Sequence, residues 1–300
     1  MGDLVLVTGG AGFIGSHLTE GLLVRGYRVR VLDNLISGFR EYVPGAAEFV
    51  QGDVADLETC RKAAQGAVGI FHLAALSRVA PSLDDVQACT YPNIIGTQNI
   101  LIAAREAGVR KLIYSASSTH YGNLPAPHRE DLPPQFLNLY SLTKHVGEQY
   151  ALMFDKMYGL PVVSLRYFNV YGPRQQMTGA YALVMGIFLR QWASGLPLTI
   201  HGDGSQSRDF VHVRDVVAAN IRAFEGDVHG DVFNIGSGVS HSVRQLADMI
   251  SADQVFEVPR KGDATATLAD ISKARAILGW VPAVDFREGV EELKRVTKGG

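Results

Sequence analysis

Short apolar runs and amphipathic stretches alternate along the first half of the chain. The apolar runs predict strands at Leu4–Thr8, Arg28–Leu32, Ala47–Gln51, Gly69–Leu73, Lys111–Ser115 and Val162–Arg166. Helical patterns lie between them, for example at Asp56–Ala64, Ile94–Ala107 and Tyr140–Tyr158. Such alternation predicts an α/β fold, a doubly wound parallel sheet covered by helices on both faces.

The pattern becomes less regular after about residue 170, where glycine and proline punctuate the chain. We therefore predict two parts, residues 1–170 with the main sheet and residues 171–300 forming mainly a smaller α/β lobe. An apolar run at Val232–Ile235 predicts that the chain returns to the main sheet near residues 232–236.

Three glycines, Gly9, Gly12 and Gly15, connect the first strand to a helical segment that starts at Phe13. Glycine allows the sharp turn and the close backbone approach that a pyrophosphate requires, and the helix N-terminus offers N–H donors. The second strand ends at Asp33, where a carboxylate would bind the ribose hydroxyls of NAD and repel the 2′-phosphate of NADP. The stretch therefore predicts a Rossmann-type dinucleotide site with NAD preferred over NADP, although a glycine-rich turn in any α/β protein is the alternative.

Composition narrows the class of protein. The 300 residues are 47% hydrophobic and 19% charged with a formal net charge of −2, which favours a sizeable core and argues against nucleic acid as a partner. Neither cysteine, Cys60 or Cys89, lies in a CxxC pair, so we expect neither a disulfide framework nor a metal site. We see no signal peptide and no apolar run of membrane-spanning length, and we expect a cytoplasmic protein with no membrane partner.

A second chemical signal is the pair Tyr140 and Lys144, which share one helix face because they are four residues apart. A nearby ammonium favours the phenolate, so Tyr140 is a candidate general base. Hydroxyls at a strand end, Ser115 to Ser118, could hydrogen-bond a reacting oxygen. An exposed amphipathic helix and a polar turn are the ordinary alternatives for these two segments.

Together, the segments TGGAGFIGSH, LDN, GDV, FHLAA, SASSTHYG, YSLTK, RYFNVYGPRQ, GDGSQSRDFVHVRDV and ADISKA resemble the extended short-chain dehydrogenase/reductases. Within that family the match is to nucleotide-sugar epimerases similar to UDP-glucose (UDP-galactose) 4-epimerase. The resemblance implies the cofactor NAD, a UDP-sugar substrate and a homodimer built through a four-helix bundle. It implies 4-epimerisation of a UDP-hexose through a 4-keto intermediate.

The resemblance also implies roles for individual residues. Tyr140 would be the base, Lys144 would bind the nicotinamide ribose and tune Tyr140, and Ser117 would bind the sugar O4. The cofactor-binding set would be Gly9, Gly12, Phe13, Ile14, Gly15, Asp33, Asn34, Gly38, Asp53, Val54, Leu73, Ala74, Ala75, Ser115, Tyr140, Lys144 and Tyr167. The substrate-binding set would be Ser117, Ser118, Asn169, Arg208, Arg260, Asp263 and Thr267, with the two arginines on the phosphates.

Other reactions of the family stay open to different degrees. A dehydratase or a decarboxylase is disfavoured because no acid lies in Ser117-Ser118-Thr119-His120, and we expect His120 to pack beside Tyr121. A UDP-glucuronate 4-epimerase is the main alternative, with Thr178 and either Arg174 or Arg190 as carboxylate donors. A non-catalytic NAD-binding regulator is less favoured because Ser117, Tyr140 and Lys144 are all present.

Thr267 bears on the range of sugars. In the family that the chain resembles, a bulky aromatic residue at this position blocks a 2-acetamido group, and threonine is smaller. The resemblance therefore implies that UDP-GlcNAc and UDP-GalNAc are accepted besides UDP-glucose and UDP-galactose. The alternative is that Thr267 only packs within the lobe.

Overall fold

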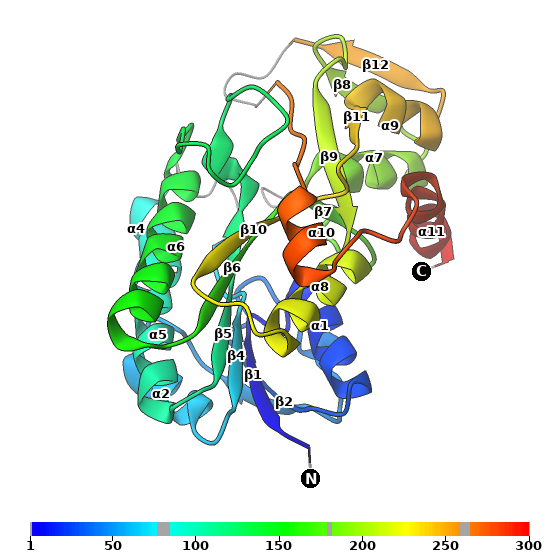
Figure 1. Ribbon diagram of the computed structural model, residues 1–300. Helices are drawn as coiled ribbons and strands as arrows, with labels where there is room; N and C mark the ends of the chain where they lie inside the picture. The colour runs from blue at the N-terminus through cyan, green and yellow to red at the C-terminus, as the bar shows by residue number, and fades with distance from the viewer. Residues whose placement is uncertain (1, 77–84, 179–181, 259–264, 300) are drawn as a thin grey trace.

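A single parallel sheet organises the first half of the chain. The computed structural model describes residues 2–76, 85–178, 182–258 and 265–299. Seven strands lie in the order β10-β6-β5-β4-β1-β2-β3, and every neighbouring pair is parallel (Figure 1). The strands are β1 (Leu4–Thr8), β2 (Arg28–Asp33), β3 (Glu48–Gln51), β4 (Gly69–His72), β5 (Lys111–Ser117), β6 (Val162–Tyr167) and β10 (Asp231–Ile235). The doubly wound fold is confirmed, and the run at 232–235 is β10, which pairs with β6.

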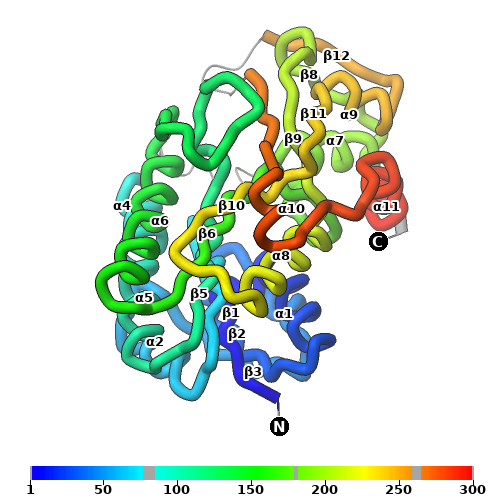
Figure 2. Tube along the Cα trace, in the orientation of Figure 1, coloured from blue at the N-terminus to red at the C-terminus, as the bar shows by residue number. Residues whose placement is uncertain are grey.

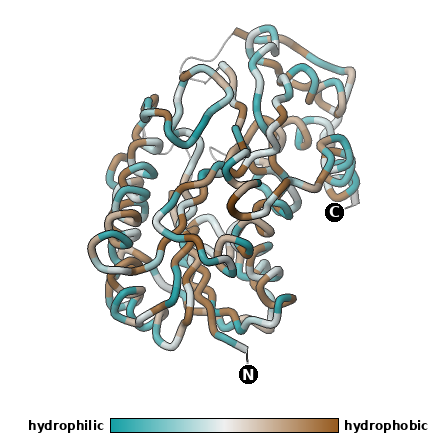
Figure 3. Tube along the Cα trace, viewed as in Figure 1, coloured by the Kyte–Doolittle hydropathy of each residue, from teal (hydrophilic) through white to brown (hydrophobic). Residues whose placement is uncertain are grey.

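The core lies on both faces of this sheet. All five residues of β1 are buried, and its side chains alternate between two hydrophobic clusters. Val5 and Val7 belong to one cluster, and Leu4 and Leu6 belong to the other. Figure 3 shows hydrophobic colouring along these central strands. Because alternate residues of a strand point to opposite faces, a run that is apolar throughout requires cover on both sides.

Helices supply that cover. On one face lie α1 (Phe13–Val24) and α8 (Val213–Glu225), and on the other lie α2 (Leu57–Ala64), α5 (Gly96–Ala107) and α6 (Leu139–Tyr158) (Figure 1). The helix expected at Ile94–Ala107 starts differently, because α4 (Val86–Thr90) continues through a π-helical turn, Tyr91–Ile95, into α5. Hydrophobic periodicity alone does not distinguish such a wide turn from an α-helical one.

Smaller sheets and a third hydrophobic cluster form above the carboxyl ends of the main strands. One sheet has the order β11-β9-β7, from Ser240–Ser242, Ser207–His212 and Asn169–Tyr171, and another pairs β12 (Gln254–Glu257) with β8 (Leu198–His201). The helices α7 (Val184–Ala193), α9 (Val243–Ile250) and α11 (Phe286–Gly299) pack around the third cluster. Figure 2 shows the chain leaving this region for α8 and β10 and then entering it again. A further helix, α10 (Ser272–Leu278), packs near β10.

The sheet topology creates a position at which folds of this kind commonly bind ligands. Strand order reverses at β1, which pairs with β2 on one side and with β4 on the other. In open parallel sheets the crevice outside the carboxyl ends of the strands at such a reversal is the usual ligand site. The glycine-rich turn leaves β1 at this point.

Candidate active site

A cavity of about 1090 Å³ runs from the glycine-rich turn to the smaller sheets. Both sets of residues predicted from the sequence contribute to its wall. Those that line it are Gly9, Gly12, Phe13, Ile14, Gly15, Asp33, Asn34, Asp53, Val54, Leu73, Ala74, Ala75, Ser115, Ser117, Ser118, Tyr140, Lys144, Tyr167, Asn169 and Arg208. Gly38 and Thr267 are not among the lining residues, and Arg260 and Asp263 lie outside the described residues.

The turn after β1 needs its glycines. Gly9 has a φ of 71°, in the left-handed region that favours glycine. A Cβ atom on Gly15 would lie 2.1 Å from the carbonyl oxygen of Gly9, so α1 approaches the turn too closely for any side chain there. The amide of Gly12 donates to the same oxygen at 3.1 Å, and Gly12 is the N-cap of α1. The first N–H groups of α1 therefore face the cavity from a rigid turn.

Asp33 is held firmly at the end of β2. Its Oδ2 accepts from the amide of Ala11 at 3.0 Å, and its Oδ1 accepts from the amide of Leu35 at 2.8 Å. Burial raises the pKa of Asp33, and these two hydrogen bonds act in the opposite direction. The carboxylate thus has a structural task that sequence reasoning did not foresee, because it ties β2 to the glycine turn. Next to it, Asn34 Nδ2 donates to Asp53 Oδ2 at 2.9 Å.

Sequence reasoning also missed Thr8 and His72, which fix the start of the segment that follows β4. Thr8 Oγ1 lies 2.7 Å from His72 Nδ1 and accepts from the amides of Leu73 and Ala74, both at 3.2 Å. Burial lowers the pKa of His72 to about 3, so this imidazole is neutral. The histidine inside the FHLAA segment was the feature of the sequence that could have indicated this contact.

The pair Tyr140 and Lys144 reaches the cavity from the first turns of α6. The side chain of Asn138 caps this helix by accepting from the amide of Ser141 at 2.9 Å. The helix lies very close to β5, since a Cβ on Gly147 would be 2.2 Å from the hydroxyl oxygen of Tyr114. Close packing of this kind fixes the direction of both side chains toward the cavity.

Lys144 is buried, and its Nζ lies 4.5 Å from the centre of the Tyr114 ring. Burial lowers the pKa of Lys144 to about 7, while the nearby carboxylate of Glu148 partly opposes this shift. Lys144 follows Tyr140 by four residues on α6, so its amine lies on the same helix face as the Tyr140 phenol.

Hydroxyl groups gather where β5 and β6 end. Ser117 Oγ lies 2.9 Å from Thr119 Oγ1 and accepts from the Thr119 amide at 3.3 Å. Ser115 Oγ lies 3.0 Å from the Tyr167 hydroxyl, which donates to Asn220 Oδ1 at 2.9 Å. Burial raises the pKa of Tyr167 to about 12, so this phenol stays protonated and is no candidate base.

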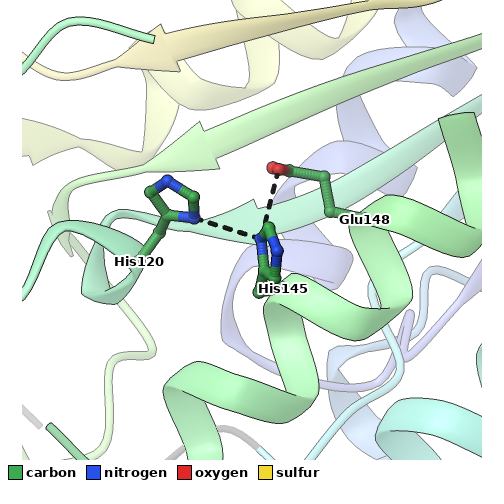
Figure 4. Close-up of side chains that lie close together, drawn as sticks. All are labelled: His120, His145 and Glu148. Atoms are coloured by element: carbon green, nitrogen blue, oxygen red, sulfur yellow. Dashed lines mark hydrogen bonds and ion pairs between the residues drawn. The ribbon is translucent and has the colours of Figure 1, made fainter. Parts of the chain in front are cut away.

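Two histidines and a glutamate form a cluster next to these hydroxyl groups. Figure 4 shows His120, from the 3-10 turn Ser118–Tyr121, close to His145 and Glu148 of α6. The two Nδ1 atoms are 3.2 Å apart, and Glu148 Oε1 lies 3.9 Å from His145 Nδ1. Arg166 already binds both carboxylate oxygens of Glu148, at 2.6 and 2.9 Å. The Arg166 guanidinium therefore balances the negative charge of the Glu148 carboxylate. We interpret the cluster as a link that fixes the 3-10 turn against α6. His120 also packs edge-on against Tyr121, as predicted.

The opposite end of the cavity depends on side chains. Asn169 Nδ2 donates to the Asp209 carbonyl at 3.0 Å and to Thr267 Oγ1 at 3.1 Å. Thr267 Oγ1 also accepts from the Asp209 amide at 3.1 Å, so Thr267 lies directly behind a cavity-lining residue. Arg208 lines the cavity, and its Nη1 donates to the Ser207 carbonyl at 2.9 Å.

Several polar residues of this end were not found from the sequence. They come from α7, β8, β12 and the loop before β9, and they are Gln191, Thr199, His201, Gln206 and Glu257. Gln191 Nε2 donates to Thr199 Oγ1 at 2.8 Å, and His201 lies 3.7 Å from Glu257. No spacing in the sequence connects these positions; for example, the pairing of β8 with β12 is what brings His201 beside Glu257.

The comparisons with known proteins agree with this geometry. Residues 5–236 match the family described as the NAD dependent epimerase/dehydratase family. The chain belongs to this family. Its members use NAD, and the cavity carries the glycine turn and the acidic strand end that suit this cofactor. Within the described ranges, no helix combines the length and apolar character that a bilayer span requires.

Individual relatives are similar over nearly their whole length. A UDP-glucose 4-epimerase of Mycolicibacterium smegmatis is 40% identical over 95% of both chains. The structure of a UDP-glucose 4-epimerase from Thermotoga maritima with UDP-glucose has a TM-score of 0.95 and 36% identity, covering 99% of both chains. A UDP-N-acetylglucosamine 4-epimerase from Methanobrevibacter ruminantium, in complex with UDP-N-acetylmuramic acid, has a TM-score of 0.93 and 34% identity, covering 98% of both. The chain is thus an enzyme of the NAD-dependent UDP-sugar epimerase group.

Proposed function

We propose that the protein is a UDP-hexose 4-epimerase that interconverts UDP-glucose and UDP-galactose through a 4-keto sugar. The observation that carries this proposal is the convergence of Ser117, Tyr140 and Lys144 on the cavity that also holds the glycine turn. A regulator that only bound the dinucleotide would not require a base, its ammonium neighbour and a hydroxyl donor on one wall.

In this proposal, Tyr140 removes the proton of the sugar 4-hydroxyl while Ser117 hydrogen-bonds O4. Lys144 stabilises the phenolate that receives this proton and binds the nicotinamide ribose. NAD, when bound, supplies the hydride acceptor and donor for C4. Release and return of the hydride on opposite faces of the 4-keto sugar would invert C4. Asn169 and Arg208, with Arg260 beyond the described residues, would bind the diphosphate.

The site also supports a wider range of sugars. Thr267 lies behind Asn169, and its side chain is small at this position. We therefore propose that 2-acetamido sugars are accepted, which agrees with the two solved structures of glucose and N-acetylglucosamine epimerases being nearly equally similar. Steric exclusion discriminates by repulsion, so a small residue broadens specificity without adding an attractive contact.

A UDP-glucuronate 4-epimerase is the second candidate, and one observation favours it. Thr178 and Arg190 both line the cavity and could bind a carboxylate. Arg174, the other donor considered, is ion-paired with Glu20 at 2.5 Å and is not among the lining residues. A dehydratase or decarboxylase stays disfavoured, since the strand-end segment that reaches the cavity carries hydroxyls and no acid.

We further propose a homodimer in which the outer face of α6 meets its counterpart. Tyr150, Met153, Met157 and Tyr158 leave 38%, 45%, 63% and 49% of their surface exposed on this helix. Large apolar side chains grouped on one helix face are typical of a partner interface. Light scattering at micromolar concentration should give the mass of two chains, and a monomer would contradict the proposal.

A cytoplasmic location is proposed because Cys60 and Cys89 are both free thiols.

The decisive experiment for the reaction is incubation with a panel of UDP-sugars, followed by NMR for inversion at C4. We expect conversion of UDP-glucose and UDP-galactose, and of UDP-GlcNAc and UDP-GalNAc. Inversion of UDP-glucuronate alone would favour the second candidate. Loss of water or carbon dioxide from a sugar without inversion would contradict the epimerase.

A further inference from the structure

One segment of the C-terminal half lies across the first βα unit of the main sheet. We call residues 173–178 the strap; it follows β7 and precedes the segment that leads to α7. The Pro173 carbonyl lies 2.9 Å from His17 Nε2, and Arg174 Nη2 donates to Glu20 Oε1 at 2.5 Å. His17 and Glu20 both belong to α1, so the strap is attached to the helix that starts at the glycine turn.

A second attachment reaches the loop after β2. Gln176 Nε2 donates to the Ser37 carbonyl at 3.2 Å, and the Arg174 guanidinium lies 5.4 Å from the centre of the Tyr42 ring. Ser37 and Gln176 both line the large cavity, although they are 139 positions apart in the chain. This hydrogen bond therefore joins the strap to the loop after β2, two parts of the cavity wall that are far apart in the sequence.

The strap is braced from its other side as well. A Cβ on Gly186 would lie 2.5 Å from the Gln176 carbonyl oxygen, which shows that α7 packs tightly on the strap. Met177 packs against the hydrophobic cluster of the C-terminal lobe. Arg174 has a φ of 66°, a conformation that costs energy for a residue other than glycine and persists only when the surroundings hold it. The strap is therefore clamped between the lobe and the first βα unit.

We propose that the strap, fastened by Arg174 to Glu20 and by Gln176 to Ser37, retains NAD in its site between turnovers. This role follows from the side of the cavity that the strap touches, because Ser37 belongs to the loop that follows Asp33, beside the glycine turn. In this proposal, the Gln176–Ser37 contact has to open before a dinucleotide bound on that side can leave past Gln176. Retention of NAD requires only that the protein binds NAD. The benefit of this retention rests on the proposed function, since an epimerase returns the cofactor to its starting state in each cycle.

The test measures how fast NAD dissociates. Wild type, Glu20→Gln, Gln176→Ala and the double variant are loaded with labelled NAD and diluted into an excess of unlabelled NAD. The Arg174–Glu20 pair is partly exposed, with 28% and 41% of the two side chains accessible, so each fastener alone is modest. We expect dissociation about threefold faster in each single variant and about tenfold faster in the double variant.

The matched control is Glu225→Gln. It removes the 2.6 Å ion pair between Glu225 and Arg25, which links the other end of α1 to α8 away from the large cavity. We expect wild-type NAD dissociation from this control, even where it lowers the melting temperature of the NAD-free protein as much as Glu20→Gln does. Wild-type dissociation from the double variant, or equal acceleration in the control, would overturn the proposal.

A separate measurement keeps this proposal distinct from the proposed function. With NAD in saturating excess, Glu20→Gln should epimerise UDP-sugars within about twofold of wild type, because Glu20 lies on α1 and is not among the residues that line the cavity. If no protein in the series inverts any sugar, the epimerase is wrong, and the NAD dissociation rates still decide the role of the strap.

Discussion

The two ends of the cavity are built in different ways. At the glycine-turn end, the short stretch Gly9 to Gly15 contributes backbone to the wall, and Asp33 fixes it through the Ala11 amide. The opposite end, at the C-terminal lobe, is a collection of side chains such as Gln191, His201 and Arg208 from separate elements. Backbone geometry tolerates almost no substitution, whereas side chains can be exchanged one at a time. The first end therefore suits a constant ligand, and the second suits a variable one.

The largest effect should come from the residue between the two ends. Tyr140→Phe keeps the ring but removes the proton acceptor, so turnover should fall by ~10²–10⁴-fold. NAD should remain bound, because the glycine turn is untouched. Turnover by NMR and bound NAD by absorbance after desalting check both parts. Near-wild-type turnover would show that another group is the base.

The next change tests the rigidity of the glycine-turn end. Gly15→Ala places a Cβ 2.1 Å from the Gly9 carbonyl oxygen, and if overpacking of ~1–3 kcal/mol is all lost from binding, NAD should bind about 5- to 150-fold more weakly. Gly45→Ala is the matched control, because a Cβ there meets nothing within 4 Å. Calorimetry with NAD should distinguish the two, and equal affinities would mean that the turn adapts.

The same end should discriminate between cofactors. The carboxylate of Asp33 accepts two backbone hydrogen bonds and cannot swing away from a 2′-phosphate without breaking them. Like charges held a few ångströms apart near a protein surface repel by ~1–4 kcal/mol, so NADP should bind at least about 10-fold more weakly than NAD. Titration calorimetry with both cofactors measures this ratio, and a ratio near one would refute the role given to Asp33.

A selective effect is expected at the lobe end. Thr267→Tyr should slow acetamido sugars by about 10-fold or more relative to UDP-glucose, because the larger ring would fill the space beside C2. Thr267→Val provides the control, since it removes the hydroxyl that accepts from Asn169 and Asp209 but keeps the size. The valine variant should affect both sugars alike. If tyrosine also slows both equally, Thr267 has only a structural role.

The last test concerns pH and the buried amine of Lys144. Its pKa is about 7 in the folded protein and has an ordinary value of 10.5. Between these pH values the unfolded chain binds one more proton, so this group makes the NAD-free protein more stable as pH rises from about 7 to 10. Below pH 7 the cost of the buried charge is fully present. Denaturant unfolding gives the free energies of unfolding of wild type and Lys144→Met across this pH range. Their difference should change in favour of wild type as pH rises, and a constant difference would contradict the lowered pKa.

The main sheet could be predicted from the sequence because local patterns determine it. A strand such as β1 that is apolar at every position has to be covered on both faces, and the glycine spacing places a tight turn at its end. The predicted strands agree with the structure except at their ends. The start of α5 was misplaced, because a π-helical turn keeps nearly the same apolar spacing as an α-helix. Recognising Tyr140 and Lys144 as a candidate pair needed their spacing of four residues together with the glycine turn and the polar strand end that precede them.

Other features required the folded chain. The double duty of Asp33, the Thr8–His72 contact and the grouping of polar residues around β8 and β12 depend on which strands become neighbours. The strap is the strongest case, since Ser37 and Gln176 are 139 positions apart and meet through one hydrogen bond. Periodicity and spacing report contacts within an element or across one turn, and they determined the sheet, the glycine turn and the placing of Tyr140 and Lys144 on one helix face. Contacts between distant segments follow from how whole elements pack, so only the tertiary structure decided the shape of the lobe end and the contact between the strap and the loop after β2.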